Sequence, residues 1–359
     1  MGRNITGAIS SGKDVEHQPA AKPIAFVTGS TGLLGNNLVR ELLAVGFAVR
    51  ALARSREKAL SQLVGLNVEI VEGDMLDVPR FAAALQGVEV IFHTAAYFRD
   101  SYKGGTHWQK LYDANVLGTR TLLRQGYASG VRRFVHASSI AVLIGEPGQL
   151  IDETMLRKEE QADDYYRSKI LSDREVLTFL DHHSAMWAAM VLPGWMHGPG
   201  DAGPTSAGQI VLDFARGRLP GKPPGTFPLV DARDVAKAMI LANDRGVRGE
   251  RYLAAGRHMT AGELFPLLEQ ITGVRAPRQD IPLFLLYLIA GLSEIKARLT
   301  QKHVALSWAG VRAMVKEKDR SHFNHAKSEQ QLGLKFRPVE WTLRDEVQWY
   351  RDHEFLPST

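Results

Sequence analysis

The stretch that decides the fold is Thr28-Gly29-Ser30-Thr31-Gly32-Leu33-Leu34-Gly35, which directly follows the apolar run Ile24-Ala25-Phe26-Val27. A short apolar run that ends in Thr-Gly is typical of a buried parallel strand. Leu34, Leu38 and Leu42 then recur at helical spacing before Gly46, which predicts a helix that ends there. The order strand, glycine turn and helix indicates a site for a dinucleotide.

Each glycine of this stretch has an expected task. Gly29 permits a tight turn after the strand, Gly32 lets the backbone approach a pyrophosphate, and Gly35 lets the helix pack against the sheet. N–H groups and the positive dipole at the helix N-terminus favour bound phosphates. The cofactor-binding residues expected here are Gly29, Thr31, Gly32, Leu33, Leu34 and Gly35.

Further apolar runs at 48–52, 68–71, 90–93, 133–137 and 186–192, with a helix over 115–125, predict more strands and helices in alternation. This order predicts an α/β fold with a doubly wound, Rossmann-type parallel sheet. Glycine and proline become dense from about Pro193, and a smaller, mostly helical C-terminal substrate lobe is expected there. The expected divisions are a disordered extension over 1–22, an NADP-binding Rossmann domain with the catalytic residues over 23–192, and mainly the substrate lobe over 193–359, with about 226–255 returning to the Rossmann domain.

The amino-acid composition limits the classes of function that this chain can have. The 359 residues are 45% hydrophobic and 23% charged, as in ordinary globular proteins. The absence of cysteine excludes disulfides and thiolate chemistry and fits a cytoplasmic protein. No His/Asp/Glu spacing resembles a metal site. The net charge of +5 is scattered among acidic residues, which argues against nucleic acid as a partner.

One apolar run, Ile281 to Leu292, is too short to span a membrane and contains Pro282. Lys296 and Arg298 follow it, so a helix on a membrane surface is one interpretation. The sequence favours the other interpretation, a core or dimer helix.

The residues after the second expected strand bear on the choice of cofactor. An NAD site usually offers an acidic residue there for the ribose 2′-hydroxyl. This chain has Arg54, whose guanidinium suits a 2′-phosphate, and Arg56 is placed to assist. We therefore expect NADP(H) rather than NAD. Asp74 and Met75, after the third strand, are placed to meet the adenine.

The expected chemical centre is Tyr165-Tyr166-Arg167-Ser168-Lys169. Tyr165 and Lys169 share one helix face, and a neighbouring ammonium lowers the pKa of a phenol toward the working range. Ser139, at the end of the fifth expected strand, is placed to hydrogen-bond the same substrate oxygen.

With these motifs in place, the chain resembles the extended short-chain dehydrogenase/reductases, the NAD-dependent epimerase/dehydratase family, from about Ile24 to about Phe355. Beyond the glycine stretch, the matching segments are Gly73-Asp74, Phe92-His93-Thr94-Ala95-Ala96, Asn115-Val116-x-Gly118-Thr119, Ala137-Ser138-Ser139, Tyr165-x-x-Ser168-Lys169, Leu192-Pro193-Gly194 and Val230-Asp231-Ala232-Arg233-Asp234.

The resemblance implies roles for individual residues. Ser139, Tyr165 and Lys169 resemble the catalytic set, and Lys169 would also hold the nicotinamide ribose. Ser138 is an alternative to Ser139, and Tyr166 is an alternative to Tyr165. The positions that resemble further cofactor contacts are Ala95, Ala96, Asn115, Pro193 and Gly194. Relatives also suggest a homodimer.

The branch most similar to this chain is the dihydroflavonol-reductase-like one. It implies an NADP-dependent oxidoreductase that reduces a ketone or aldehyde, or runs the reverse reaction. A nucleotide-sugar epimerase with tightly bound NAD(P) and a non-catalytic NADP-binding sensor are the alternatives. A group of aromatic residues predicts a pocket for a small-molecule substrate with an apolar or aromatic body, and packing between the lobes is the other interpretation; the residues are Tyr97, Phe98, Tyr102, Trp108 and Trp195. Of these, Tyr97 and Trp195 are the expected substrate residues.

Overall fold

A seven-stranded parallel sheet with the order β3-β2-β1-β4-β5-β6-β9 carries the expected site. The computed structural model describes residues 22–98, 107–300 and 308–357. The expected extension over 1–22 lies outside these residues except for its last one, and Tyr102 also lies outside them. The sheet confirms the α/β, Rossmann-type prediction.

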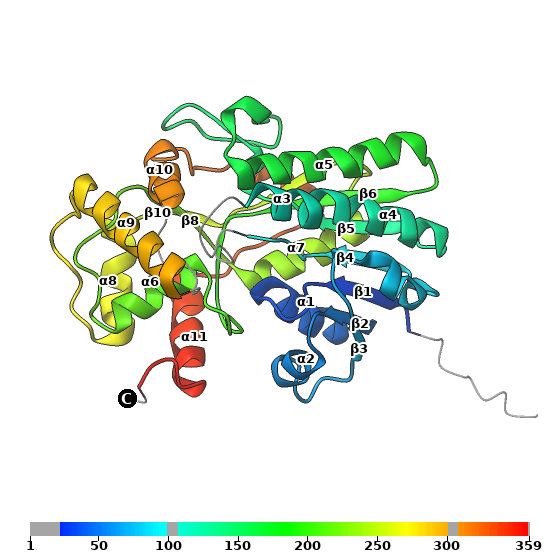
Figure 1. Ribbon diagram of the computed structural model, residues 1–359, viewed down its shortest axis with the longest axis horizontal. Helices are drawn as coiled ribbons and strands as arrows, with labels where there is room; N and C mark the ends of the chain where they lie inside the picture. Colours follow the sequence, from blue (N-terminus) through cyan, green and yellow to red (C-terminus); the bar gives the residue numbers. More distant parts are fainter. Residues whose placement is uncertain (1–21, 99–106, 301–307, 358–359) are drawn as a thin grey trace, which may run out of the picture.

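The strands of this sheet are β1 (Ile24–Thr28), β2 (Ala48–Ala53), β3 (Glu69–Glu72), β4 (Val90–His93), β5 (Arg133–Ala137), β6 (Trp187–Pro193) and β9 (Arg251–Ala254). The chain starts at β1 and then runs outward in both directions, so the strand order reverses between β1 and β4. At such a point the loops at the carboxyl ends of the two strands separate and open a crevice. In Figure 1 the carboxyl ends of these strands face the second lobe.

Helices cover both faces of the sheet. One apolar cluster joins α1 (Leu33–Ala44) and α7 (Ala232–Arg245) to the strands. The cluster on the other face contains α4 (Gly118–Ala128), α5 (Asp164–His182) and the 3₁₀ segment Val78–Leu85. The short α2 (Arg56–Gln62) and α3 (Trp108–Leu111) complete this domain.

The lobe contains a second sheet, which the sequence did not predict. Its strands are β7 (Trp195–His197), β8 (Thr226–Asp231) and β10 (Arg257–Thr260), in the order β10-β8-β7. β8 is parallel to β7 and antiparallel to β10. Within the segment expected to return to the Rossmann domain, α7 and β9 lie there, whereas β8 belongs to this second sheet.

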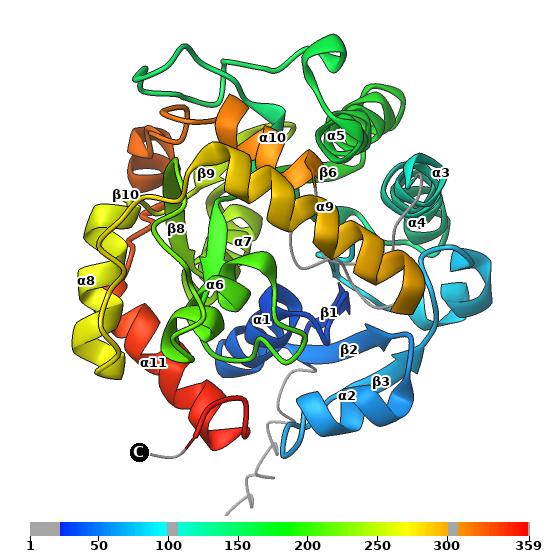
Figure 2. The same ribbon diagram turned by 60° about the vertical axis from the view of Figure 1, so that its left-hand side comes forward.

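The helices of the lobe are α6 (Ser206–Ala215), α8 (Ala261–Thr272), α9 (Leu283–Thr300), α10 (Trp308–Lys316) and α11 (Val339–Asp352). Apolar side chains of α6, α8 and α11 share one buried cluster with β8 and β10. α9 and α10 form a small cluster of their own. Figure 2 shows α9 as an outer helix that crosses in front of the sheet.

Two glycines allow the two sheets to approach. A Cβ on Gly194 would lie 2.4 Å from the carbonyl oxygen of Pro228 and 2.5 Å from that of Ala255. A Cβ on Gly256 would lie 2.0 Å from the carbonyl oxygen of Leu229. These distances exclude any side chain, so the chain can cross between the sheets only at residues that have none.

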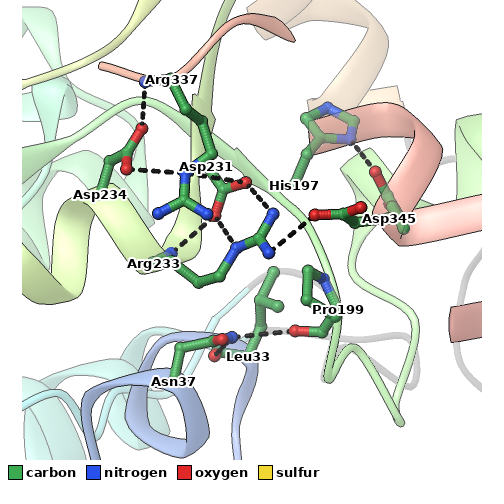
Figure 3. A network of polar contacts seen from close by, with 10 residues as sticks. Leu33, Asn37, His197, Pro199, Asp231, Arg233, Asp234, Arg337 and Asp345 are labelled. Carbon is green, nitrogen blue, oxygen red and sulfur yellow. Dashed lines mark hydrogen bonds and ion pairs between the residues drawn. The ribbon is translucent and has the colours of Figure 1, made fainter. Parts of the chain in front are cut away.

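A network of ion pairs holds the start of α7 to α11 (Figure 3). Asp231 caps α7 and accepts two hydrogen bonds from the guanidinium of Arg233, at 2.9 and 2.7 Å. The same guanidinium pairs with Asp345 on α11 at 2.8 Å. Arg337, just before α11, pairs with Asp234 at 2.8 Å. Asp231 and Asp234 are buried, whereas the side chain of Asp345 is 46% exposed. The network therefore runs from the buried start of α7 to the surface and connects α11 to the Rossmann domain.

Candidate active site

The glycine turn lies where β1 and β4 approach each other. Gly29 has φ +67°, and a Cβ there would lie 2.8 Å from the backbone nitrogen of Ala95. The hydroxyl of Thr28 accepts hydrogen bonds from the N–H groups of Thr94 and Ala95, both at 3.1 Å. The loops after β1 and β4 are therefore locked together, and Thr28 is a residue whose side chain the sequence reasoning overlooked.

Gly35, expected to let the helix pack against the sheet, also has a nearer neighbour. A Cβ on Gly35 would lie 2.1 Å from the carbonyl oxygen of Gly29. Gly32 donates its N–H to the same carbonyl at 3.0 Å. The third glycine therefore packs against the turn itself, and it keeps the turn close to the first residues of α1.

The N-terminus of α1 fits an anionic group. Gly32 is its N-cap, and within the described residues no side chain caps it and no acidic residue stands in its first turn. Leu33 and Leu34 are buried and anchor the helix, while Thr31 is half-buried and Gly32 is exposed. The free N–H groups of the first turn are suited to a pyrophosphate.

α1 is also tied to the lobe. The side-chain amide of Asn37 donates to the carbonyl oxygens of Leu33 and Pro199, both at 2.9 Å (Figure 3). Pro199 follows β7, so this bond holds the entry to the lobe beside the glycine turn.

Arg54 directly follows β2 and is exposed, and no described residue pairs with it. Arg56 starts α2, and its guanidinium donates to the carbonyl of Ile70 on β3 at 3.4 Å. Asp74 accepts from the N–H of Leu76 at 3.0 Å. Met75 is buried against the start of α4, where a Cβ on Gly118 would lie 2.9 Å from its carbonyl oxygen.

Tyr165 and Lys169 lie one turn apart on α5, and both are buried. Asp163 caps the start of the helix, and its carboxylate accepts from the N–H of Tyr166 at 2.9 Å. Lys169 Nζ donates to the carbonyl oxygen of Ala137 at the end of β5, at 2.9 Å. Because Ser139 follows Ala137 by two residues, the serine and the lysine lie at the same end of β5.

Burial shapes the charge of this region. It lowers the pKa of Lys169 to about 8, while the nearby carboxylate of Asp173 raises it. Burial lowers the pKa of His93 to about 3, and the charge of Lys169 acts in the same direction. Burial also lowers the pKa of His136. The histidines are therefore neutral near pH 7, and Lys169 carries the positive charge beneath the site.

The alternative catalytic residues, Ser138 and Tyr166, have different surroundings from Ser139 and Tyr165. Ser138 is buried, whereas Ser139 is half-buried and its hydroxyl oxygen accepts from the N–H of Ala141 at 3.1 Å, which leaves its hydrogen to donate. The ring of Tyr166 lies 4.8 Å from the guanidinium carbon of Arg157. These surroundings favour Ser139 and Tyr165, whose roles stay predictions.

Asn115 lies in a π-helical turn, Tyr112–Leu117, between α3 and α4. Its amide donates to Ser168 Oγ at 3.0 Å and to the carbonyl of Tyr97 at 2.9 Å. Its oxygen accepts from the N–H of Tyr97 at 2.7 Å. The hydroxyl of Ser168 in turn donates to the carbonyl of Tyr165 at 2.8 Å. Asn115 therefore connects the loop after β4 to the helix of Tyr165.

The two expected substrate residues lie in different places. Tyr97 packs in the small cluster that contains Tyr165, and its hydroxyl lies 3.1 Å from Nδ1 of His107. The ring of Phe98 meets that of Tyr165 edge to face at 4.6 Å. Trp195 instead packs against Phe227 in the core of the lobe, with ring centres 5.4 Å apart.

The remaining expected cofactor contacts surround the carboxyl edge of the sheet. Ala95 and Ala96 follow β4, and Pro193 ends β6. Gly194 donates its N–H to the carbonyl of Ala254 at 3.2 Å. In the part of the chain that the structure describes, no group of three or more His, Asp or Glu residues could hold a metal ion. The same part contains no helix long and apolar enough to cross a membrane.

Comparisons with known proteins agree with this arrangement. Residues 25–255 match the NAD dependent epimerase/dehydratase family. Sterol demethylase protein B of Methylococcus capsulatus is 38% identical over 92% of this chain and 99% of its own length. A Synechocystis protein provisionally named dihydroflavonol 4-reductase is 32% identical over 96% and 99%.

Among solved structures, that of gox2253 has a TM-score of 0.77 and 32% sequence identity, and the match covers 93% of this chain and 100% of that one. Members of the matched family bind nicotinamide dinucleotides, and the glycine turn and the uncapped start of α1 fit such a group. The chain belongs to the NAD-dependent epimerase/dehydratase family, the extended short-chain dehydrogenase/reductases.

Proposed function

We propose that this protein is an NADP(H)-dependent oxidoreductase that interconverts a ketone or aldehyde and its alcohol. The observation that carries the proposal is the buried pair Tyr165 and Lys169 on α5, with Lys169 bonded to the end of β5 two residues before Ser139. This pair offers a proton and a positive charge beside the expected cofactor crevice.

Each side chain has a separate task in the proposed reduction. When bound, the reduced nicotinamide supplies a hydride to the carbonyl carbon. Tyr165 donates its phenolic proton to the carbonyl oxygen, and Ser139 donates a hydrogen bond to the same oxygen. The charge of Lys169 favours the phenolate that Tyr165 becomes. In the reverse direction the phenolate of Tyr165 accepts the proton of the alcohol.

The preference for NADP(H) rests on Arg54. An exposed guanidinium directly after β2 is suited to a 2′-phosphate, which it can hold through two parallel hydrogen bonds. Arg56 is a weaker candidate because its guanidinium already bonds to Ile70.

The proposed substrate is an apolar or aromatic carbonyl compound. Tyr97 and Phe98 pack beside Tyr165, so apolar surface adjoins the reacting group. Two relatives that match nearly the whole chain carry names that refer to a sterol and to a dihydroflavonol. Both names denote fused or linked ring systems with few charges, which suit such a surface.

The test is a spectrophotometric assay of NADPH and NADH oxidation with a panel of steroid ketones, dihydroflavonols and simple aldehydes. We expect NADPH-dependent turnover with a ring-containing carbonyl, and Tyr165→Phe should lower kcat by about 100- to 10,000-fold. Unchanged turnover in Tyr165→Phe would contradict the mechanism. Interconversion of a nucleotide sugar without net NADPH consumption would instead support an epimerase, and binding of NADPH without any turnover would support a sensor.

A further inference from the structure

An apolar stripe runs along one exposed face of α9. Its side chains follow one another at steps of four, four, three and four residues, which places them on one side of a helix. All five are between 56% and 81% exposed. The members of this α9 stripe are Phe284, Leu288, Leu292, Ile295 and Leu299.

The opposite face of α9 is already occupied. Leu286 and Ala290 are buried against Val311 of α10, and the ring of Tyr287 lies 5.0 Å from that of Trp308. The sequence favoured a core or dimer helix here, and the structure buries only this face. The stripe is therefore not part of the core of the described chain.

The segments that form α9 and α10 are basic in sequence. Residues 281–300 and 308–320 contain six Lys or Arg and three Asp or Glu, which gives +3 of the net charge of +5 of the whole chain. Arg312 on α10 and Lys318 after it are exposed. Trp308, whose ring packs beside Tyr287 of α9, is 45% exposed. An exposed aliphatic helix face in a segment that also carries tryptophan and basic residues has the composition of a helix that lies in a membrane interface.

We propose that the α9 stripe docks on the surface of a bilayer that contains anionic lipids. α9 would lie parallel to the membrane, with the aliphatic side chains among the acyl chains and the basic residues at the headgroups. The charge decides between a bilayer and a second copy of the chain. Two copies joined through this face would bring like charges together, whereas anionic headgroups complement them.

The experiment is flotation of the full chain with vesicles of phosphatidylglycerol and phosphatidylcholine, compared with pure phosphatidylcholine, at low and high salt. The stripe is tested with the double variant Leu288→Glu/Leu292→Glu. The matched control is Leu60→Glu on α2, because Leu60 is 55% exposed and Leu288 is 56% exposed. Leu299→Glu is a second variant, since a side chain 81% exposed contributes little to packing.

We expect the unmodified protein and Leu60→Glu to float with anionic vesicles at low salt and to be released by high salt. The double variant should lose binding on the order of tenfold or more, and Leu299→Glu should lose part of it. Circular dichroism and the thermal midpoint establish that each variant is folded.

Two results would overturn the proposal. One is failure of the unmodified protein to float with anionic vesicles at low salt, or flotation that the stripe variants do not reduce. The other is a dimer, measured by light scattering without lipid, that the double variant converts to a monomer. That result would make the stripe an interface between copies.

Discussion

The side-chain amide of Asn115 donates a hydrogen bond to the hydroxyl of Ser168 at 3.0 Å, and it thereby joins the π-helical turn to the helix that carries Tyr165. The same amide group holds both backbone polar groups of Tyr97. One side chain thus sets the distance between the aromatic loop after β4 and the proposed proton donor.

Replacing Asn115 should separate these two parts. We expect Asn115→Ala to lower kcat/KM on the order of 100-fold, because small displacements of reacting groups are costly, while the Kd for NADPH changes little. Ser168→Ala removes one of the bonds and should have a smaller effect. Steady-state kinetics and cofactor titration measure the two quantities, and a wild-type kcat/KM in Asn115→Ala would exclude the positioning role.

The pH profile of alcohol oxidation should report Lys169. Its pKa is about 8, so the ammonium loses its proton above that pH and no longer favours the Tyr165 phenolate. We expect kcat/KM to fall on the alkaline side with an apparent pKa near 8. In Lys169→Arg the charge persists, and the alkaline fall should move to higher pH. An alkaline fall at the same pH in Lys169→Arg would assign it to another group.

The same lysine should affect stability. Its pKa is about 8 in the folded protein and near the ordinary 10.5 when unfolded, so between these values the unfolded state binds more protons. The free energy of unfolding should therefore rise with pH over this window, relative to Lys169→Met. Denaturant unfolding of both proteins at several alkaline pH values measures the difference, and parallel pH curves would contradict the shifted pKa.

Arg54 and Arg56 form a matched pair for the cofactor. We expect Arg54→Ala to raise KM for NADPH about tenfold and leave KM for NADH nearly unchanged, since one charge-assisted pair contributes about 1.5–3 kcal/mol. Arg56→Ala should change neither by more than about twofold, because Arg56 is bonded to β3. The opposite ranking would make Arg56 the phosphate ligand, and no change in either variant would argue against NADP(H).

Gly35 can be tested against Gly203. Alanine normally favours a helix over glycine by about 1 kcal/mol, yet at Gly35 its Cβ would collide with the carbonyl of Gly29 at 2.1 Å. We expect Gly35→Ala to lower both the thermal midpoint and the affinity for NADPH. Gly203 has nothing within 4 Å of an added Cβ, so Gly203→Ala should leave both unchanged. Equal thermal midpoints and equal NADPH affinities in the two variants would show that the glycine turn accommodates the added Cβ at little cost.

Long apolar runs made the central sheet predictable. Strands β1 to β6 lie within one or two residues of their expected ranges, because buried parallel strands need continuous apolar residues. β7 and β10 have three and four residues, and neither is a continuous apolar run, unlike β4, which also has four. The second sheet could not be found for that reason.

Site residues that belong to a sequence motif could be predicted, whereas residues whose role depends on local backbone geometry or on burial could not. Lys169 bonds to the end of β5 two residues before Ser139, and Tyr165 lies one turn before Lys169 on α5; the catalytic roles of the three residues stay predictions. The π-helical turn around Asn115 could not be predicted, because one extra residue in a single turn gives no distinct sequence pattern. The exposure of Leu288 was equally hidden, since an apolar run does not say which of its faces a neighbour covers.

The crossings between the two sheets have a consequence for how this protein unfolds. The chain leaves the large sheet at Gly194, returns with α7, leaves again at Gly256, and returns before α11, where Arg337 binds Asp234. Neither half is thus a continuous stretch that could fold alone, although the composition changes near Pro193. A single cooperative melting transition is the natural result, and expression of residues 23–192 by themselves would yield a chain that lacks both α7 and the strand that completes its sheet.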